Sequence, residues 1–371
     1  MTSEQRLSIS LGGVLTVFAA IAVAIIGWQL KGLLLLVMIS VVLACSIAPI
    51  VSWAEQFRIP RWLGALLTYL AIIGTLVGVV LLIGPTVLDQ IQLLVKQLPL
   101  LLRKAATQVE AWALNLNDTR PDFTTQIFDQ LDVQAIAAWA IRSTRQVALR
   151  SINVTTGLLG TLLSLVLAIF ISGYMLADSD TLTKNFARIL PQPWDQKISD
   201  QLPEIGDRIG SYIRGRFIVS ATLALATSVG LTFLGLQDFA IGLGAIAGVT
   251  NLVPFLGPLL GAIPALVVAI PQGGWIVLWV ILFYIVIQNI ETYLLDPLLV
   301  GTSVGVHPLY QLLAVLGGTQ VLGIVGALIV PPWVAGCAVL LENLYIQPKL
   351  AAEGDRRPAQ HSRSKQAEVK H

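Results

Sequence analysis

Charged residues are scarce in this sequence: they make up 12% of its 371 residues, whereas a soluble domain carries roughly 25%. Hydrophobic residues make up 56%, and the mean hydropathy is +0.79. Apolar runs of about 20 residues recur along the chain, which is the length that a helix needs to cross a bilayer. The composition therefore excludes an ordinary soluble domain and predicts an all-α fold, a polytopic transmembrane helical bundle in the lipid bilayer.

Cysteine is also rare, and the two present, Cys45 and Cys337, lie in separate hydrophobic segments without a CxxC pair. This excludes a disulfide framework and predicts no metal site. The net charge is only +2, and no basic cluster of the kind that binds nucleic acid is present. We therefore expect no nucleic-acid partner.

Enzyme motifs are missing as well. The sequence contains no HExxH or Walker A motif. We therefore predict that the protein is not an enzyme and needs no cofactor. Without a Walker motif, any transport would be secondary and not driven by ATP hydrolysis in this chain.

The apolar runs predict about eight spans, with seven to nine possible because half-spans and re-entrant hairpins look alike in sequence. Residues 1–85 contain the first three spans, at 11–30, 32–53 and 62–85. Residues 86–151 carry charges and glutamines opposite an apolar stripe, and we interpret them as an extramembrane insertion of amphipathic helices. Residues 152–348 are predicted to form the transmembrane core, and the polar residues 349–371 a disordered cytoplasmic tail.

Within the core, the fourth span is predicted at 152–177, the fifth at 217–236 and a later one at 275–295. Pro191 and Pro193 are expected to break the amphipathic segment between the fourth and fifth spans. A glycine-rich segment, 308–330, is expected to end at Pro331 and Pro332 before a last apolar stretch, 333–346.

Lysine and arginine residues near the short loops favour one side of the membrane. They lie at the N-terminus, in the turn at 58–61, in the segment 184–216 and in the C-terminal tail. With an even number of spans, this pattern places both termini in the cytoplasm of a protein in the cell (inner) membrane. The insertion would then lie outside, where its two-faced helices meet solvent or another copy of the chain, so we expect a homo-oligomer.

The segment Asn251–Pro264, NLVPFLGPLLGAIP, interrupts an otherwise apolar region with three prolines and two glycines. Each interior proline removes a backbone hydrogen bond and clashes with the preceding turn, so one regular helix is not expected here. Non-helical backbone at membrane depth is tolerated where it is buried in protein or lines a wet cavity, and broken helices of this kind form substrate sites in transporters. The alternative is a kinked helix that only packs. The backbone positions concerned are Pro254, Gly257, Pro258, Gly261 and Pro264.

Four polar residues lie in or at the end of a later apolar span: Gln288, Asn289, Glu291 and Asp296. A carboxylate at the bilayer centre costs about 2.5–3.5 kcal/mol, so it should face a cavity or a partner. Glu291 is our candidate for a coupling-ion or proton site. The alternative is an interhelical hydrogen bond or ion pair that holds the bundle together.

Three further residues complete the candidate site. Asp296 precedes Pro297, which favours a helix end near the interface over substrate contact. His307 precedes Pro308 and could titrate near neutral pH, although a lone histidine at an interface is more often structural. Asn251 is expected to cap the helix of the proline-rich segment, with ligand contact as the alternative.

Three segments of the C-terminal half resemble the autoinducer-2 exporter family of bacterial permeases: NLVPFLGPLLGAIPAL, QNIETYLLDPLLVGTSVGVHPL and LGGTQVLGIVGALIVPP. The resemblance extends over about residues 10–348. It implies a secondary transporter of about eight spans, and family members are associated with autoinducer-2 export and, in some cases, with sodium/proton antiport. Carried over by position, the family motifs fall on Pro254, Gly257, Pro258, Gly261, Pro264, Glu291, Asp296, Pro297, Gly301, His307 and Pro308.

The sequence thus predicts a secondary transporter of a small polar solute or ion, with autoinducer-2-type export as one possibility. The broken segment would supply backbone ligands, and Glu291 would bind the coupling proton or cation. Two alternatives remain: a sodium/proton antiporter, and a passive oligomeric pore or membrane scaffold in which Glu291 is architectural.

Overall fold

The computed structural model describes residues 29–117, 154–300 and 307–352, together with Phe18, Ile25 and Gly27. All regular elements in this part of the chain are helices, which confirms the predicted all-α fold. The predicted first span lies almost entirely outside the described residues. The second half of the insertion, Gly301 and nearly all of the C-terminal tail also lie outside them.

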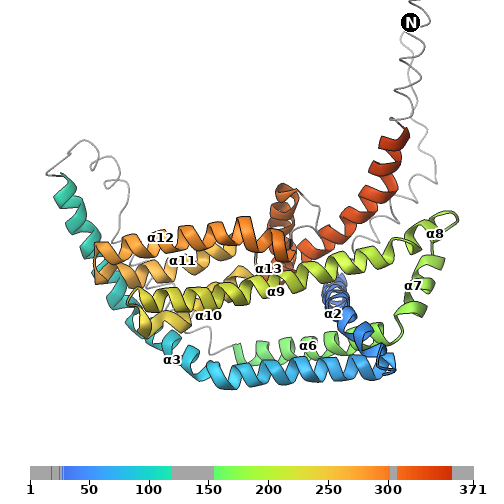
Figure 1. Ribbon diagram of the computed structural model, residues 1–371, viewed down its shortest axis with the longest axis horizontal. Coiled ribbons are helices and arrows are strands. Elements are labelled where there is room, and N and C mark those ends of the chain that lie inside the picture. The colour runs from blue at the N-terminus through green and yellow to red at the C-terminus, as the bar shows by residue number, and fades with distance from the viewer. Residues whose placement is uncertain are drawn as a thin grey trace, which may run out of the picture.

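The first two described helices are α2 (Lys31–Glu55) and α3 (Arg61–Asn117). Helix α2 matches the second predicted span. Helix α3 is 57 residues long and runs through Pro85 and Pro99, so it continues beyond residue 85, where the third span was predicted to end. An internal proline removes one hydrogen bond and bends a helix without always ending it, and Figure 1 shows α3 changing direction along its length.

The middle of the chain forms α6 (Val154–Ala177), α7 (Ser179–Arg188), α8 (Trp194–Ser199) and α9 (Leu202–Phe233). Helix α7 bends away from α6 by 86°. The predicted break near Pro191 and Pro193 separates α7 from α8. Helix α9 is continuous and begins well before the predicted start of the fifth span, so its arginines lie within the helix.

The C-terminal half places α10 (Gln237–Asn251), α11 (Leu256–Ala269) and α12 (Gly274–Ile290) side by side with α9, as Figure 1 shows. The 3₁₀ turn η1 (Ile270–Gln272) connects α11 to α12. Helix α12 continues directly into a π-helix, η2 (Glu291–Val300). Helix α9 is central to the fold, because it packs against α2, α10, α13 and η2.

The last long element, α13 (Pro308–Leu341), consists of two arms joined at Gly323, whose φ of 69° and ψ of −157° are not helical. A methyl group on Gly318 would overlap the carbonyl oxygen of Gly326 in the other arm, although residues eight apart in a straight helix are separated by about 12 Å along the axis. The arms therefore form a tight hairpin.

The predicted break at Pro331 and Pro332 is wrong, because both prolines are buried inside the second arm of α13. The chain turns instead at Gly323, since glycine adopts a positive φ without steric cost. Neighbouring helices allow prolines to remain inside helices at membrane depth. A second π-helix, η4 (Glu342–Ile346), follows α13.

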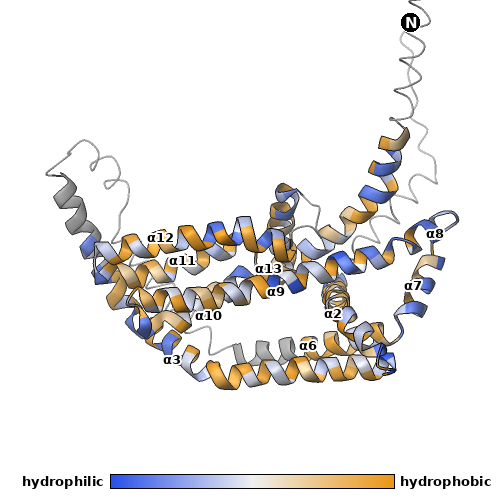
Figure 2. Ribbon diagram, viewed as in Figure 1, coloured by the Kyte–Doolittle hydropathy of each residue, from blue (hydrophilic) through white to orange (hydrophobic). Residues whose placement is uncertain are grey.

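In the part of the chain that the structure describes, five helices are long and apolar enough to cross a membrane, or six if the bent pair α6–α7 counts as one span. Large apolar side chains cover outward faces, and Leu81 and Leu82 of α3 are 73% and 80% exposed. Figure 2 shows many hydrophobic residues along α3 and α12. Such a surface suits contact with lipid, and the chain is a multi-pass membrane protein.

Candidate functional site

The centre of the candidate site is a buried ion pair between α9 and η2. Nη1 of Arg216 donates a hydrogen bond to Oε1 of Glu291 at 3.2 Å, and both side chains are only 4% exposed. An ionised carboxylate is costly at membrane depth unless a partner compensates its charge. Glu291 therefore forms an interhelical ion pair, one of the two arrangements that the sequence left open.

Three further polar side chains surround this pair. Arg216 also donates from Nη1 to Oδ1 of Asp296 at 3.4 Å and from Nη2 to Oδ1 of Asn251 at 3.2 Å. Gln288, three residues before Glu291, donates from Nε2 to Oε2 of that carboxylate at 3.0 Å. We call these five residues, contributed by α9, α10, α12 and η2, the Arg216 cluster.

The charges of the Arg216 cluster do not balance. In their ionised forms, Glu291 and Asp296 place two negative charges around the single positive charge of Arg216. Both oxygens of Glu291 accept hydrogen bonds, whereas the side chain of Asp296 is 39% exposed. The cluster therefore carries an excess of negative charge, and the carboxylate of Asp296 is the more accessible of its two acidic groups.

Close backbone packing brings η2 against α9. A methyl group on Gly215, next to Arg216, would overlap the carbonyl oxygen of Leu299 and lie 3.1 Å from Cα of Val300. On the other side, a methyl group on Gly248 would lie 2.6 Å from Cβ of Ala224, so α10 also approaches α9 closely. Glycine at these positions lets three helices meet at Arg216.

The break that the sequence predicted lies between α10 and α11, and it is confined to Leu252–Phe255. Phe255 has a φ of 65°, which is rare for a residue with a side chain, and the N–H of Leu256 bonds to the carbonyl of Pro254 at 2.7 Å. Helix α11 then runs through Pro258 and Pro264. Pro258 falls in the first turn, where a helix does not need its N–H.

Asn251 does not cap the helix that follows it, so this prediction is wrong. Asn251 is the last residue of α10 and is 1% exposed, whereas Phe255 occupies the N-cap position of α11 without a side-chain hydrogen bond. The amide of Asn251 accepts from Arg216 instead, because the turn of Leu252–Phe255 separates it from α11.

The position of Asp296 before Pro297 predicted that the helix would end there, and this prediction is wrong. The helix continues as η2 to Val300, with Pro297 inside it. Local π-helical adjustment is one way in which membrane helices accommodate a proline, since it offers the freed backbone groups other partners. Asp296 consequently faces Arg216 from within the helix.

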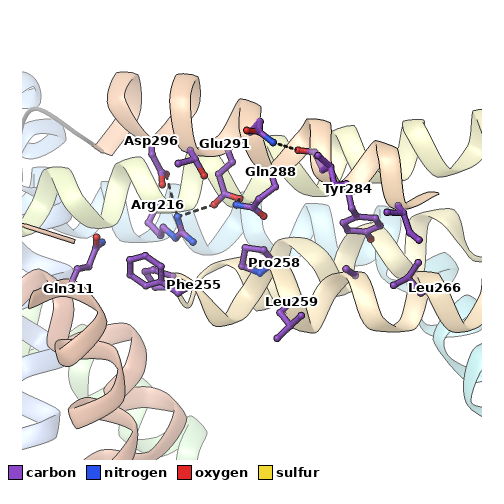
Figure 3. Close-up of a pocket in the computed structure, with 16 residues that line it drawn as sticks. Arg216, Phe255, Pro258, Leu259, Leu266, Tyr284, Gln288, Glu291, Asp296 and Gln311 are labelled. Carbon is purple, nitrogen blue, oxygen red and sulfur yellow. Dashed lines mark hydrogen bonds and ion pairs between the residues drawn. The ribbon is translucent and has the colours of Figure 1, made fainter. Parts of the chain in front are cut away.

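A cavity of about 620 Å³ lies beside the cluster, between α11 and α12–η2. Figure 3 shows Glu291, Asp296 and Gln288 on one wall and Phe255 and Pro258 on the opposite wall, with Arg216 between them. The remaining lining is mostly apolar, and it also includes Asn289, Thr292 and Gln311. The cavity thus has a charged end and apolar walls, which is the usual construction of a small-molecule site.

The predicted site residues with side chains fall into three groups: those that surround Arg216, one that only lines the cavity, and one that lies outside the cavity. Glu291, Asp296, Gln288 and Asn251 come together around Arg216. Asn289 lines the same cavity, but its Nδ2 donates to the carbonyl of Ile285 in its own helix.

His307 lies outside the cavity lining. It is exposed at the N-terminus of α13, where its Nδ1 accepts a hydrogen bond from the N–H of Leu309. Pro308 is the first residue of that helix. Among the described residues, no three His, Cys, Asp or Glu side chains gather closely enough to hold a metal ion.

Sequence reasoning missed Arg216 as the partner of the acidic residues. The residue was counted among the arginines that flank the fifth span, because a charge at the edge of an apolar run is typical of an interfacial loop. Glu291 itself could have indicated this partner, because a carboxylate within an apolar span needs a cationic partner. Arg216 is a candidate for it, since it adjoins an apolar run. Tyr212, one turn earlier on α9, was missed too; its hydroxyl accepts from Gln311 of α13 at 3.1 Å.

Comparison with known proteins gives consistent matches. The family model described as "AI-2E family transporter" matches residues 14–346. The chain is 28% identical over 313 residues to the Bacillus subtilis (strain 168) protein named "Putative transport protein YrrI". The aligned region covers 84% of this chain and 86% of that protein. The chain is 26% identical over 339 residues to a Synechocystis protein named "Putative transport protein sll0063", with 88% and 82% of the two chains covered.

Proposed function

Because the chain belongs to the AI-2E family of transporters, we propose that this membrane transporter is a secondary one that moves a small polar solute or ion. The coupling proton or cation binds at the Arg216 cluster, and the solute binds in the adjoining cavity. The excess carboxylate charge in a buried cluster that lines a cavity carries this proposal.

The contacts support different roles for the two acidic residues, Glu291 and Asp296. Glu291 is buried and bonded through both oxygens, so a change in its charge changes the contact between α9 and η2. Asp296 is half-exposed at the cavity, so it is accessible to an incoming cation. Neutralising either carboxylate leaves Arg216 with one anionic partner, which alters the attraction between the helices.

The break at Leu252–Phe255 supplies a site of movement next to the cluster. Asn251 on one side of the break is bonded to Arg216, while Phe255 and Pro258 on the other side line the cavity. A change at Arg216 can therefore shift α10 relative to α11. This would open the cavity to one side of the membrane at a time, as alternating access requires.

Autoinducer-2-type export and sodium/proton antiport are two forms of this proposal. We also propose that the protein lies in the inner membrane as a homo-oligomer, with both termini in the cytoplasm. The competing hypothesis is a passive pore or scaffold, in which the Arg216 cluster only holds helices together.

Flux into proteoliposomes that contain the purified protein separates these functions. Proton and sodium gradients are imposed in turn, internal pH is followed, and candidate solutes including autoinducer-2 are added. We expect uphill movement of a solute or counter-ion that stops when the gradient is collapsed. Downhill leak that ignores the type of gradient would overturn the proposal in favour of a pore.

A further inference from the structure

The cavity beside the Arg216 cluster has one charged end and an extended apolar remainder. The charged end carries two carboxylates and one guanidinium group. Leu259, Leu266, Ile281 and Ile285 contribute to the apolar walls, together with the aromatic side chains of residues 255 and 284. A ligand that fills this space must therefore match both parts.

The charged end favours a positively charged ligand head. Arg216 is already engaged with Glu291, Asp296 and Asn251. Asp296 is the exposed member: only its Oδ1 has a hydrogen-bond partner among the described residues, and its side chain is 39% exposed. A cationic head at Asp296 would restore charge balance without displacing the buried pair, whereas an anion would add a like charge.

The walls favour an organic body on that cation. A bare metal ion would leave the apolar lining without contact, while a hydrocarbon body would bury it. Phe255 lies across the cavity from Asp296 in Figure 3, and aromatic faces attract cations. Tyr284 lies farther along, with its hydroxyl donating to the carbonyl of Gly261 at 3.2 Å, so its ring is held against α11.

We propose that the cavity binds a small monovalent organic cation with an apolar body, its head at Asp296 and its body between α11 and α12. This inference rests on the proposed function, because it names the class of solute that the transporter carries. The organic cation and the coupling cation then occupy Asp296 in turn, as exchange of one cation for the other requires. The volume of about 620 Å³ lies within the range of small-ligand sites, roughly 300–1,000 Å³.

Binding is tested on the full-length protein in detergent by titration calorimetry with benzyltrimethylammonium. Benzenesulfonate and benzyl alcohol serve as an anionic and a neutral probe with the same aromatic body. We expect saturable binding of the cation and none of the anion. Equal binding of the anion, or no binding of the cation, would overturn the inference.

Two pairs of variants locate the ligand. Asp296→Asn should weaken binding of benzyltrimethylammonium about tenfold or more, because it removes the accessible charge. Asp238→Asn, at an exposed aspartate of α10 outside the cavity, is its control. Phe255→Leu should weaken binding by about threefold to tenfold through loss of the ring face, with Phe233→Leu, at an 86% exposed position, as control.

Thermal unfolding of each variant shows whether a loss of binding reflects loss of fold. Unchanged affinity in a folded Asp296→Asn protein would contradict the placement of the ligand head. Cation binding without coupled flux in proteoliposomes would retain the ligand class and overturn the proposed function. Coupled flux of another solute by a protein that does not bind the cation would retain the function and overturn this inference.

Discussion

Arg216 and Glu291 lie 75 residues apart in the sequence, yet Nη1 of the arginine is 3.2 Å from Oε1 of the glutamate. Each side chain is 4% exposed, so both charged groups are removed from water and each compensates the charge of the other. A buried pair of this kind does not need to stabilise a protein overall, but removing one partner is strongly destabilising. The pair therefore constrains the stability of the bundle.

Arg216→Met should lower the free energy of unfolding by about 3–5 kcal/mol, because it leaves Glu291 and Asp296 as unpaired carboxylates. Glu291→Met should cost less, since Arg216 keeps Asp296 as a partner. The double variant should cost less than the sum of the two single changes, because it removes both charges of the buried pair. Chemical denaturation of the purified proteins measures all three values.

The wild type and Glu204→Gln, which breaks an exposed ion pair with Arg208, are the controls for this cycle. Exposed pairs contribute only about 0–1 kcal/mol, so this variant should unfold close to the wild type. Strict additivity of the Arg216 and Glu291 changes would contradict energetic coupling between the two residues.

Gly215→Ala should separate η2 from α9, because the added methyl group overlaps the carbonyl oxygen of Leu299. Overpacking of this kind costs about 1–3 kcal/mol, and here it would also displace the ion pair next to it. Gly74→Ala, at a position of α3 without a neighbouring atom within 4 Å, is the matched control and should unfold like the wild type or later. Equal melting temperatures for Gly215→Ala and Gly74→Ala would show that the close approach is not required.

The hairpin in α13 can be tested with two adjacent glycines. Gly318→Ala should destabilise the protein, because its methyl group would overlap the carbonyl oxygen of Gly326 in the opposite arm. Gly317→Ala should have little effect, since no atom lies within 4 Å of the added group. Limited proteolysis and thermal unfolding measure the difference; if Gly317→Ala proved the more damaging change, the two arms could not pack as described.

The sequence predicted the break after Asn251 and the acidic residues of the candidate site, because clustered prolines and glycines, and carboxylates, are unusual in an apolar segment. It did not predict which cation pairs with them. Arg216 stands at the edge of an apolar run, and whether such a residue is interfacial or buried depends on how far the helix extends and what packs against it. Contact with η2 and α10 decides this, and that contact is set by tertiary packing around Gly215 and Gly248.

The positions at which helices turn at membrane depth were harder to predict from the sequence than the break after Asn251. Pro331 and Pro332 were expected to end a helix, yet both lie inside α13. The turn of α13 occurs at Gly323, one of several glycines in that segment, and only the backbone conformation distinguishes it. Likewise, Asp296 and Pro297 lie in a π-helix, which is defined by its backbone hydrogen-bond register. Residue types alone do not predict that register.

The most direct test of a coupling role for the Arg216 cluster is gradient-driven flux by Glu291→Gln in proteoliposomes, compared with Glu204→Gln. The two variants make the same substitution in ion pairs of equal length, 3.2 Å, one buried and the other exposed. If Glu291 couples transport, the folded Glu291→Gln protein loses uphill movement while Glu204→Gln retains it. Normal uphill transport by a folded Glu291→Gln protein would contradict the account and leave the ion pair a purely architectural role.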